Sequence, residues 1–280
     1  MKIGFIVNFE KESALEIAKK AIDILKFKAD LFCDAFAFKK LACDGVFSCD
    51  NLFEISVICI VVGGDGTIIH NAKLAAINGK PVLGINAGRI GFLSGLEADE
   101  LEKLNSLIGG ELNIEERIML DIVHTSNNSV SRFTAFNDAV ITKGNISRMI
   151  DIECNIDEHS LKYRSDGLIF ATPTGSTAYS MSAGGPIVDP ILENTIVTPI
   201  CPYAYFTRPI VLPASKQLYI KVESDDIKEA YLTVDGEVAV KISSDDVIKI
   251  SLSETKVKLI NLRKDSIYNC LEKLTGGCCK

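Results

Sequence analysis

Residues 58–70 read ICIVVGGDGTIIH, an apolar run that is broken by three glycines around one carboxylate and then resumes. Ile55 to Val62 is almost entirely apolar and rich in β-branched residues, as in a parallel strand covered on both faces. Ile68 to Ile77 suits a helix that ends at Gly79, ahead of Pro81. The stretch therefore predicts a strand, a tight glycine loop and a helix, the central part of an α/β unit.

Neighbouring segments extend this α/β pattern. Lys2 to Val7 reads as a short strand, and Val82 to Ile85 reads as the strand that returns after the helix. Ser13-Ala14-Leu15-Glu16 has the spacing of a capping box, and apolar residues then recur at helical period. We expect an open parallel sheet that binds its ligand at the carboxyl ends of its strands, where residues 63–67 lie.

From about residue 115 the pattern changes to short strands, so the second part of the chain is predicted to be mainly β. The expected strands cover residues 118–123, 132–142, 149–156, 167–171, 210–212, 217–222 and 247–252. The clearest hairpin joins Tyr231–Val234 to Glu237–Val240 through Asp235-Gly236, because this dipeptide tolerates the positive φ angles of a type I′ turn. The charged region 94–115, which contains Gly109-Gly110, is the best candidate for a domain boundary.

Composition excludes several classes of protein. A chain of 280 residues, 47% of them hydrophobic, is long enough to bury one large core or two ordinary ones. Its net charge of −7 provides no general positive field for nucleic acid or for an anionic membrane. No apolar segment has the length of a membrane span, and the N-terminus becomes charged too early for a signal peptide. We expect a cytoplasmic protein with no nucleic-acid or membrane partner.

The cysteines and histidines do not predict a metal centre. Nine cysteines show no paired C-x-x-C spacing, and we expect reduced thiols that serve mostly in packing. The three histidines, His70, His124 and His159, are scattered and form no H-E-x-x-H pattern. We therefore expect no dedicated metal-binding residues.

The loop from Gly63 to Thr67 can be interpreted in two ways. Glycines at a helix N-terminus let backbone N–H groups approach an anion, and phosphate is the natural guest. The loop lacks the lysine of a Walker loop, and the chain lacks the G-x-G-x-x-G dinucleotide fingerprint. Alternatively, it is only a tight turn with Asp65 or Thr67 as the helix cap. A carboxylate is a poor neighbour for phosphate, so its presence suggests a proton acceptor beside the phosphoryl group.

Three further stretches favour the ligand-binding interpretation. Residues 84–93, GINAGRIGFL, form a second glycine-rich loop after the next strand. Asn137-Asp138 interrupts an otherwise apolar strand. The segment from Asp166 to Pro186, DGLIFATPTGSTAYSMSAGGP, is dense in hydroxyl groups and glycine.

Taken together, these motifs, in this order and spacing, resemble the NAD kinase family over nearly the whole chain. GGDGT alone is shared with phosphofructokinases and with lipid kinases of the diacylglycerol type, whereas TPTGSTAY is far more specific. Two positions depart from the family pattern. The family usually has Asn-Glu where this chain has Asn137-Asp138, a side chain shorter by about 1.5 Å, and it often has Arg or Thr in place of Ala87.

The resemblance implies a fold, a reaction and an assembly. The fold would comprise an α/β domain at 1–95, with a parallel sheet and the GGDGT loop, a β-rich NAD-binding domain at 96–263, and a segment at 264–280 that returns to the first domain. It would be related to the diacylglycerol kinase and phosphofructokinase folds. The reaction would carry the γ-phosphate of ATP to the 2′-hydroxyl of the adenosine ribose of NAD, with a divalent metal such as Mg²⁺ carried mainly by nucleotide phosphates and water. A homodimer or homotetramer with shared active sites is expected.

The resemblance also implies roles for individual residues. Asp65 would be the catalytic base, and Gly63, Gly64, Gly66 and Thr67 would form the phosphate loop. Asp166 would hold the nicotinamide end across a subunit boundary. The other NAD-binding positions would be Asn137, Asp138, Arg148, Arg164, Thr177, Ala178, Tyr179, Ser182, Tyr203 and Glu237. For Tyr179, stacking on a ring and packing in the core are equally compatible with the sequence.

Two other functions stay open at this stage. A lipid kinase of the diacylglycerol kinase type would share the glycine loop, but it would need an apolar acceptor pocket and would have no use for the TPTGSTAY segment. A non-catalytic NAD-sensing module would bind NAD without turnover.

Overall fold

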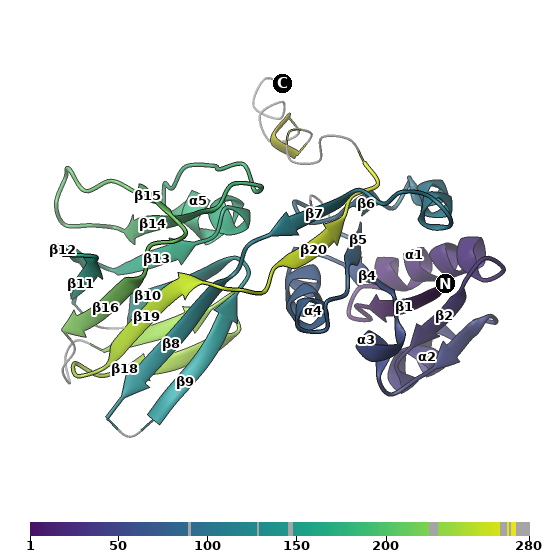
Figure 1. The fold of residues 1–280 in the computed structure, drawn as a ribbon, viewed down its shortest axis with the longest axis horizontal. Coiled ribbons are helices and arrows are strands. Elements are labelled where there is room, and N and C mark those ends of the chain that lie inside the picture. Colours follow the sequence, from purple (N-terminus) through teal and green to yellow (C-terminus); the bar gives the residue numbers. More distant parts are fainter. Residues whose placement is uncertain are drawn as a thin grey trace. The chain divides into compact units, whose positions relative to one another are not determined.

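The computed structural model describes residues 1–88, 91–127, 129–144, 148–223, 229–263, 268 and 270–272. Its contacts form two compact units, the first made of Met1–Glu116 with the described residues from Val257 onward, and the second of Arg117–Lys256 (Figure 1). The sequence placed the boundaries after residues 95 and 263 instead. The difference arises because residues 101–107 pack against the first helix and residues 114–117 pair within the first sheet.

The first unit is built on an eight-stranded sheet in which the order is β3-β2-β1-β4-β5-β20-β7, with β6 beside β5. Its strands are β1 Lys2–Val7, β2 Asp30–Cys33, β3 Val46–Ser48, β4 Ile58–Gly63, β5 Val82–Asn86, β6 Leu96–Glu97, β7 Ile114–Arg117 and β20 Val257–Ile260. Strands β1 to β6 pair in parallel, which confirms the predicted parallel sheet. Because the strands are parallel, the segments that follow β1, β4 and β5 emerge at one edge of the sheet.

Helices cover both faces of this sheet. Helices α1 Glu12–Leu25 and α2 Ala35–Leu41 and the 3₁₀ helix η1 Leu101–Leu107 share one buried apolar cluster with the strands. Helix α4 Asp65–Ile77 packs on β4, β5 and β20, and the short α3 Leu52–Ile55 packs on β1. The strand predicted from Ile55 begins only at Ile58, because α3 occupies the residues before it.

The predicted capping box at Ser13 is wrong. Helix α1 begins at Glu12, its N-cap residue is Lys11, and no side chain caps it. The Ser13 hydroxyl instead donates to the backbone oxygen of Ala87 at 3.2 Å. A contact over 74 positions in the chain has therefore replaced the local one.

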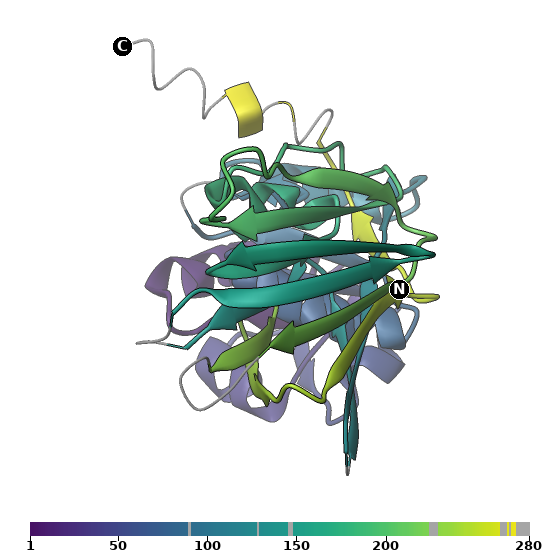
Figure 2. The ribbon, with the colours of Figure 1, turned by 90° about the vertical axis from the view of Figure 1, so that its left-hand side faces the viewer.

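The second unit contains two six-stranded antiparallel sheets with an apolar core between them. One has the order β15-β14-β13-β10-β17-β18 and the other β12-β11-β16-β19-β8-β9. Many of these strands run across the view in Figure 2. The bounds are β8 Leu120–Ser126, β9 Ser129–Ala135, β10 Asp138–Lys143, β11 Ile150–Ile156, β12 His159–Ser165, β13 Gly167–Ala171, β14 Asn194–Ile200, β15 Ile210–Pro213, β16 Leu218–Glu223, β17 Ala230–Val234, β18 Val238–Ile242 and β19 Val247–Leu252. The prediction of a mainly β second part is confirmed.

The outer face of the first of these sheets is covered by the hydroxyl-rich segment. The 3₁₀ helix η2 Thr174–Thr177 and helix α5 Tyr179–Ser182 follow β13, and Ala183 and Val188 pack on Val140, Ile169 and Ile196. The predicted hairpin is confirmed, with φ values of 49° at Asp235 and 73° at Gly236. Glu237 belongs to the turn, so β18 starts one residue later than predicted.

The strand predicted over 132–142 is interrupted. Strand β9 ends at Ala135 and β10 begins at Asp138, so Phe136 and Asn137 lie in neither. The Asp235 carboxylate accepts the N–H groups of residues 136, 137 and 138 at 2.9, 2.7 and 3.1 Å. A side chain thus replaces the strand ladder at this point.

Among the described residues, no helix is long and apolar enough to cross a membrane. Seven cysteines are described and all are free thiols. Cys278 and Cys279 lie outside the described residues, as do Arg89 and Ile90 of the second glycine loop.

Candidate active site

The GGDGT motif forms the turn between β4 and α4, as predicted. Gly64 is the N-cap residue, with an extended backbone and no side-chain cap bond. A Cβ on Gly63 would lie 2.7 Å from the Thr67 side chain, and one on Gly64 would lie 3.0 Å from Lys11 Nζ, whereas one on Gly66 would meet nothing within 4 Å. The first two glycines therefore make room for neighbouring side chains, and the third leaves open space at the start of the helix.

Asp65 does not cap its own helix. Its carboxylate accepts N–H groups from Phe92 at 3.0 Å and from Leu93 at 3.4 Å, the last two residues of the second glycine loop. The pKa of Asp65 is raised, mainly because the carboxyl group is buried and, to a smaller extent, because Glu97 lies nearby. The two N–H groups and Lys11 act in the opposite direction and offset part of this rise. The carboxyl group is thus oriented by backbone donors and made more basic than a free aspartate, as a general base requires.

Two polar side chains that the sequence analysis did not single out lie at this loop. The Asn8 amide donates to the Thr67 hydroxyl at 2.9 Å, and Lys11 Nζ lies near Gly64 and Gly88. Both residues follow β1, which pairs in parallel with β4. The rule that carboxyl ends of parallel strands meet at one edge of the sheet was the signal that could have found them.

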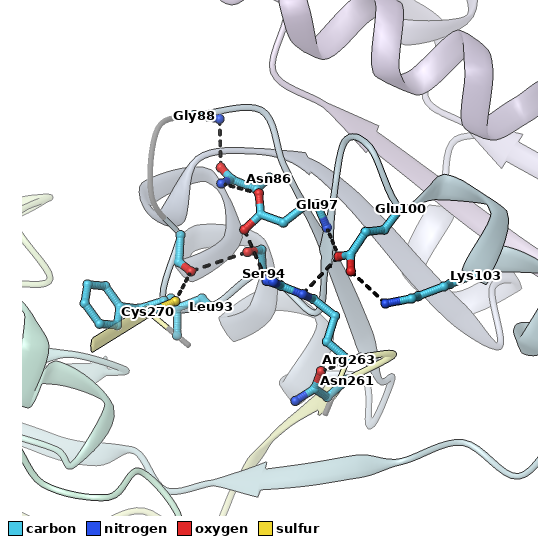
Figure 3. A network of polar contacts seen from close by, with 12 residues as sticks. Asn86, Gly88, Leu93, Ser94, Glu97, Glu100, Lys103, Asn261, Arg263 and Cys270 are labelled. Carbon is cyan, nitrogen blue, oxygen red and sulfur yellow. Dashed lines mark hydrogen bonds and ion pairs between the residues drawn. The ribbon is translucent and has the colours of Figure 1, made fainter. Parts of the chain in front are cut away.

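The second glycine loop is held by Asn86, the last residue of β5. Its side-chain oxygen accepts the N–H of Gly88 at 2.7 Å, and its amide group donates to Glu97 at 2.8 Å (Figure 3). The backbone N–H of Ala87 bonds the Gly63 oxygen at 2.8 Å. The two loops are therefore connected to each other, and both contribute to the surroundings of Asp65.

In the second unit, four predicted NAD-binding residues share one pocket. Asn137, Asp138, Ala178 and Tyr179 line a cavity of about 360 Å³. Its other lining residues are Val140, Thr142, Thr233, Asp235 and Gly236. Tyr179 is 45% exposed, so its ring does not pack in the core.

Asp138 and Asp235 form an acidic pair at this pocket. Burial raises the pKa of Asp138 to about 7, and the nearby Asp235 carboxylate adds to the effect. Asp235 was predicted only as a turn residue. Nothing local in the sequence reveals that its carboxylate bonds three N–H groups about a hundred positions away in the chain.

The TPTGSTAY segment fixes the backbone of Asn137. The Thr172 N–H donates to the Asn137 oxygen at 2.8 Å, and the Thr172 hydroxyl donates to the Phe136 oxygen at 2.6 Å. A Cβ on Gly175 would lie 2.1 Å from the Asn137 oxygen. Besides the ligand contacts predicted for it, this segment therefore positions Asn137.

The remaining predicted residues lie elsewhere in the second unit. Arg164 stacks over Tyr203 at 6.0 Å and lines a separate pocket of about 500 Å³. Asp166 forms an ion pair with Lys143 at 2.8 Å. The Thr177 hydroxyl donates to the Thr174 oxygen, and Arg148, Ser182 and Glu237 are exposed. The structure therefore groups Arg164 with Tyr203 and brings none of these seven residues into the pocket of Asn137 and Asp138.

In the described part of the chain, no group of three or more His, Cys, Asp or Glu side chains is arranged to hold a metal ion.

Comparison with known proteins gives the family. The family model of the ATP-NAD kinase N-terminal domain matches residues 46–111, and that of the C-terminal domain matches residues 136–262. An NAD kinase from Natranaerobius thermophilus is 38% identical over 98% of this chain and 98% of its own length. One from Moorella thermoacetica is 39% identical over 99% of this chain and 90% of its own length.

Solved structures share the fold. A yeast NADH kinase complexed with NADH superimposes with a TM-score of 0.88 at 24% identity, covering 99% of this chain and 87% of that one. An NAD kinase from Archaeoglobus fulgidus in complex with ATP gives a TM-score of 0.74 at 23% identity, over 98% of this chain and 99% of that one. With both family domains matched and relatives aligned over nearly the full length, the chain belongs to the NAD kinase family.

Proposed function

We propose that the protein transfers the γ-phosphate of ATP to the 2′-hydroxyl of the adenosine ribose of NAD, giving NADP and ADP. The observation that carries this proposal is the Asp65 carboxylate, oriented by two backbone N–H groups within a glycine loop of a chain from the NAD kinase family. A phosphate loop needs no carboxylate to bind phosphate, but phosphoryl transfer to a hydroxyl group needs a group that takes its proton.

In the chemical step, Asp65 accepts the proton of the 2′-hydroxyl as its oxygen attacks the γ-phosphorus. The bond between that phosphorus and the bridging oxygen of the β-phosphate breaks, and ADP leaves with the electron pair. The N–H groups of Phe92 and Leu93 keep the acceptor oxygens aimed while the carboxylate changes charge. Positioning of this kind supplies most of the rate enhancement in phosphoryl transfer.

The donor phosphates are assigned to the open side of the loop at Gly63, Gly64, Gly66 and Thr67. The N-terminus of the 13-residue helix α4 provides backbone N–H groups and the positive end of its dipole. Lys11 adds a cation beside Gly64. ATP would enter as its complex with Mg²⁺, so the metal belongs to the substrate.

The adenosine half of NAD is assigned to the pocket of about 360 Å³ in the second unit. The Asn137 amide can both donate to and accept from an adenine edge, and the Asp138 carboxylate can accept from ribose hydroxyls. Tyr179 presents an exposed ring for stacking. Thr177, Ala178 and Ser182 would line the adenine side.

The nicotinamide half and the NAD phosphates are assigned to the other predicted residues. Arg148 and Arg164 would neutralise phosphates, and Tyr203 and Glu237 would lie near the nicotinamide. Asp166 would reach the nicotinamide end of a site in the partner subunit, in a homodimer or homotetramer located in the cytoplasm.

The deciding assay incubates the purified protein with NAD, ATP and Mg²⁺ and measures NADP with an NADP-specific dehydrogenase. NADP is expected to form, and the 2′-deoxyadenosine analogue of NAD is expected to compete but never to accept phosphate, because it lacks only the attacking group. NADP is also expected to inhibit, since it keeps the contacts of NAD.

Binding of NAD without NADP formation would identify a sensing module. Phosphorylation of diacylglycerol instead would identify a lipid kinase.

A further inference from the structure

Arg263, just beyond β20, lies between two carboxylates of a distant part of the first unit. Its Nη1 donates to Glu97 Oε1 at 3.2 Å, and its Nε contacts Glu100 Oε2 at 2.9 Å (Figure 3). The arginine side chain is 12% exposed and that of Glu97 is 18% exposed. Three charged groups this well buried are expensive to desolvate, so their arrangement calls for an explanation beyond surface solubility.

Glu97 connects Arg263 to the second glycine loop. Its other carboxylate oxygen accepts the Asn86 amide at 2.8 Å, and Asn86 in turn accepts the Gly88 N–H. Strand β6, which contains Glu97, pairs in parallel with the end of β5. A chain of bonds therefore runs from Arg263 through Glu97 and Asn86 to the start of the glycine loop, as Figure 3 shows.

The N–H groups that hold Asp65 lie between the two ends of this chain of bonds. Phe92 and Leu93 come after Gly88 and before Glu97 in the sequence, so fixing Asn86 and Glu97 limits the movement of both donors. The Cys270 thiol contacts the Gly91 backbone oxygen at 3.1 Å and restrains the same segment from another side. Donors tethered at both ends keep the carboxylate in one orientation.

Glu97 also acts on Asp65 through its charge. Its negative charge raises the pKa of Asp65, whereas Lys11, the other charged group identified around this carboxyl, lowers it. An arginine bonded to Glu97 offsets part of that negative charge. Without Arg263, Glu97 would lose the cation that contacts its Oε1, whereas Glu100 would keep its ion pair with Lys103.

We propose that Arg263 is a positioning residue for Asp65: by holding Glu97 it fixes the segment that presents the Phe92 and Leu93 N–H groups and offsets the charge of Glu97. This inference rests on the proposed role of Asp65 as the base. Arg263 touches neither the substrate nor the reacting atoms in this assignment, so its effect has to appear in the titration of the base.

The test measures kcat/KM for NAD from about pH 5 to pH 9 at saturating ATP, together with thermal unfolding and NAD binding. Activity is lost on the acid side when Asp65 is protonated. In Arg263→Gln the acid limb of this pH profile is expected to move to higher pH by about half a unit, because Asp65 loses a nearby positive charge. The value of kcat/KM is expected to fall about tenfold. Arg263→Lys keeps the charge and is expected to leave the limb in place.

Two further variants separate this effect from a loss of stability. Glu97→Gln removes the charge but keeps an oxygen for Asn86, so its acid limb is expected to move down. Lys103→Gln is the matched control, because Lys103 bonds Glu100 at 2.7 Å and is 46% exposed; it is expected to leave the limb unchanged.

An unshifted limb in both Arg263→Gln and Glu97→Gln would overturn the proposal, even if the melting temperature falls. If Arg263→Gln does not fold, Glu97→Gln and Arg263→Lys decide the question alone. Failure of the proposed function looks different: the unaltered protein would make no NADP, or Asp65→Asn would retain turnover.

Discussion

Burial raises the pKa of two carboxyl groups, Asp65 in the first unit and Asp138 in the second, with different consequences. Asp65 keeps two backbone N–H donors that favour its charged form, the form that the proposed base requires. Asp138 faces the negative charge of Asp235, and its pKa of about 7 leaves it partly protonated at neutral pH. Similar burial thus raises the pKa of the proposed base in one case and places a costly carboxyl group at the proposed NAD pocket in the other.

Asp65→Asn is expected to lower kcat by at least about a hundredfold, because the amide keeps the shape of the carboxylate but cannot accept the proton. NAD binding is expected to stay within a few-fold. Steady-state kinetics with titration calorimetry measure the two effects separately. Asp23→Asn, on the exposed face of α1, serves as the control with unchanged kcat. Near-normal turnover of Asp65→Asn would remove Asp65 as the base.

Asp138→Asn is expected to stabilise the fold and weaken NAD binding. The pKa of Asp138 is higher in the folded protein, about 7, than in the unfolded chain, so this carboxyl group favours folding in acid. That contribution is present below about pH 4 and is lost as the pH rises to about 7. At pH 8 the variant should gain up to about 4 kcal/mol in free energy of unfolding, with little gain at pH 4, because each unit of the pKa shift corresponds to about 1.4 kcal/mol.

Urea unfolding of both proteins at the two pH values checks the result. A gain in stability of Asp138→Asn that does not depend on pH would show that ionisation of Asp138 is not its cause.

At the scale of elements, the TPTGSTAY segment links the sheet to the pocket. Strand β13 ends at Ala171, and the chain then bonds Phe136 and Asn137 through Thr172. Asp235, from the turn after β17, holds the same short stretch from the other side. Asn137 is therefore fixed by two elements remote from it in the chain, which explains how an interruption of the strand ladder is tolerated.

Gly175→Ala is expected to reduce NAD binding more than tenfold, because the added Cβ would lie 2.1 Å from the Asn137 oxygen and would displace that residue. Gly184→Ala is the matched control in the same segment. Its φ of 88° makes alanine strained, but nothing lies within 4 Å of the new Cβ. The control is expected to lose about 1 kcal/mol of stability while keeping NAD affinity. Equal losses of affinity in both variants would contradict the assigned role of Gly175.

At the scale of the whole molecule, each unit has its own buried core and its own candidate ligand groups. The proposed base and phosphate loop lie in the first unit, and the proposed nucleoside pocket lies in the second. Phosphoryl transfer between two nucleotides needs both, so neither unit is expected to work alone. The exposed aromatic side chains of Tyr203, Tyr205 and Phe206 leave a surface that assembly could cover.

Subunits that share sites are expected to complement one another. Asp65→Asn and Asp166→Asn are each expected to be inactive, but a mixture reassembled after dissociation is expected to recover about a quarter of normal turnover. Half of the randomly formed dimers are hybrids, and each hybrid holds one intact site of two. Each variant taken alone through the same treatment is the control. No recovery, or full activity in a monomer, would contradict shared sites.

The sequence by itself determined the strand, glycine loop and helix around Asp65 and the hairpin at Asp235-Gly236, because these features depend on local interactions. Apolar periodicity and the φ preferences of Gly and Asp act over a few residues, so they can be read without a structure. The α/β and mainly β fold classes followed in the same way. Among the site residues, Asn137, Asp138, Ala178 and Tyr179 were predicted, and the structure brings them into one pocket.

Only the tertiary structure decided which groups act on these residues. Asp65 meets the N–H groups of Phe92 and Leu93, Asp235 ends the ladder near Asn137, and Arg263 reaches Glu97 across 166 positions in the chain. The capping box at Ser13 failed for the same reason, since its hydroxyl found Ala87 instead. Hydrogen bonds and charges act through space, and folding chooses their partners by packing whole elements, a choice that no short stretch of sequence encodes.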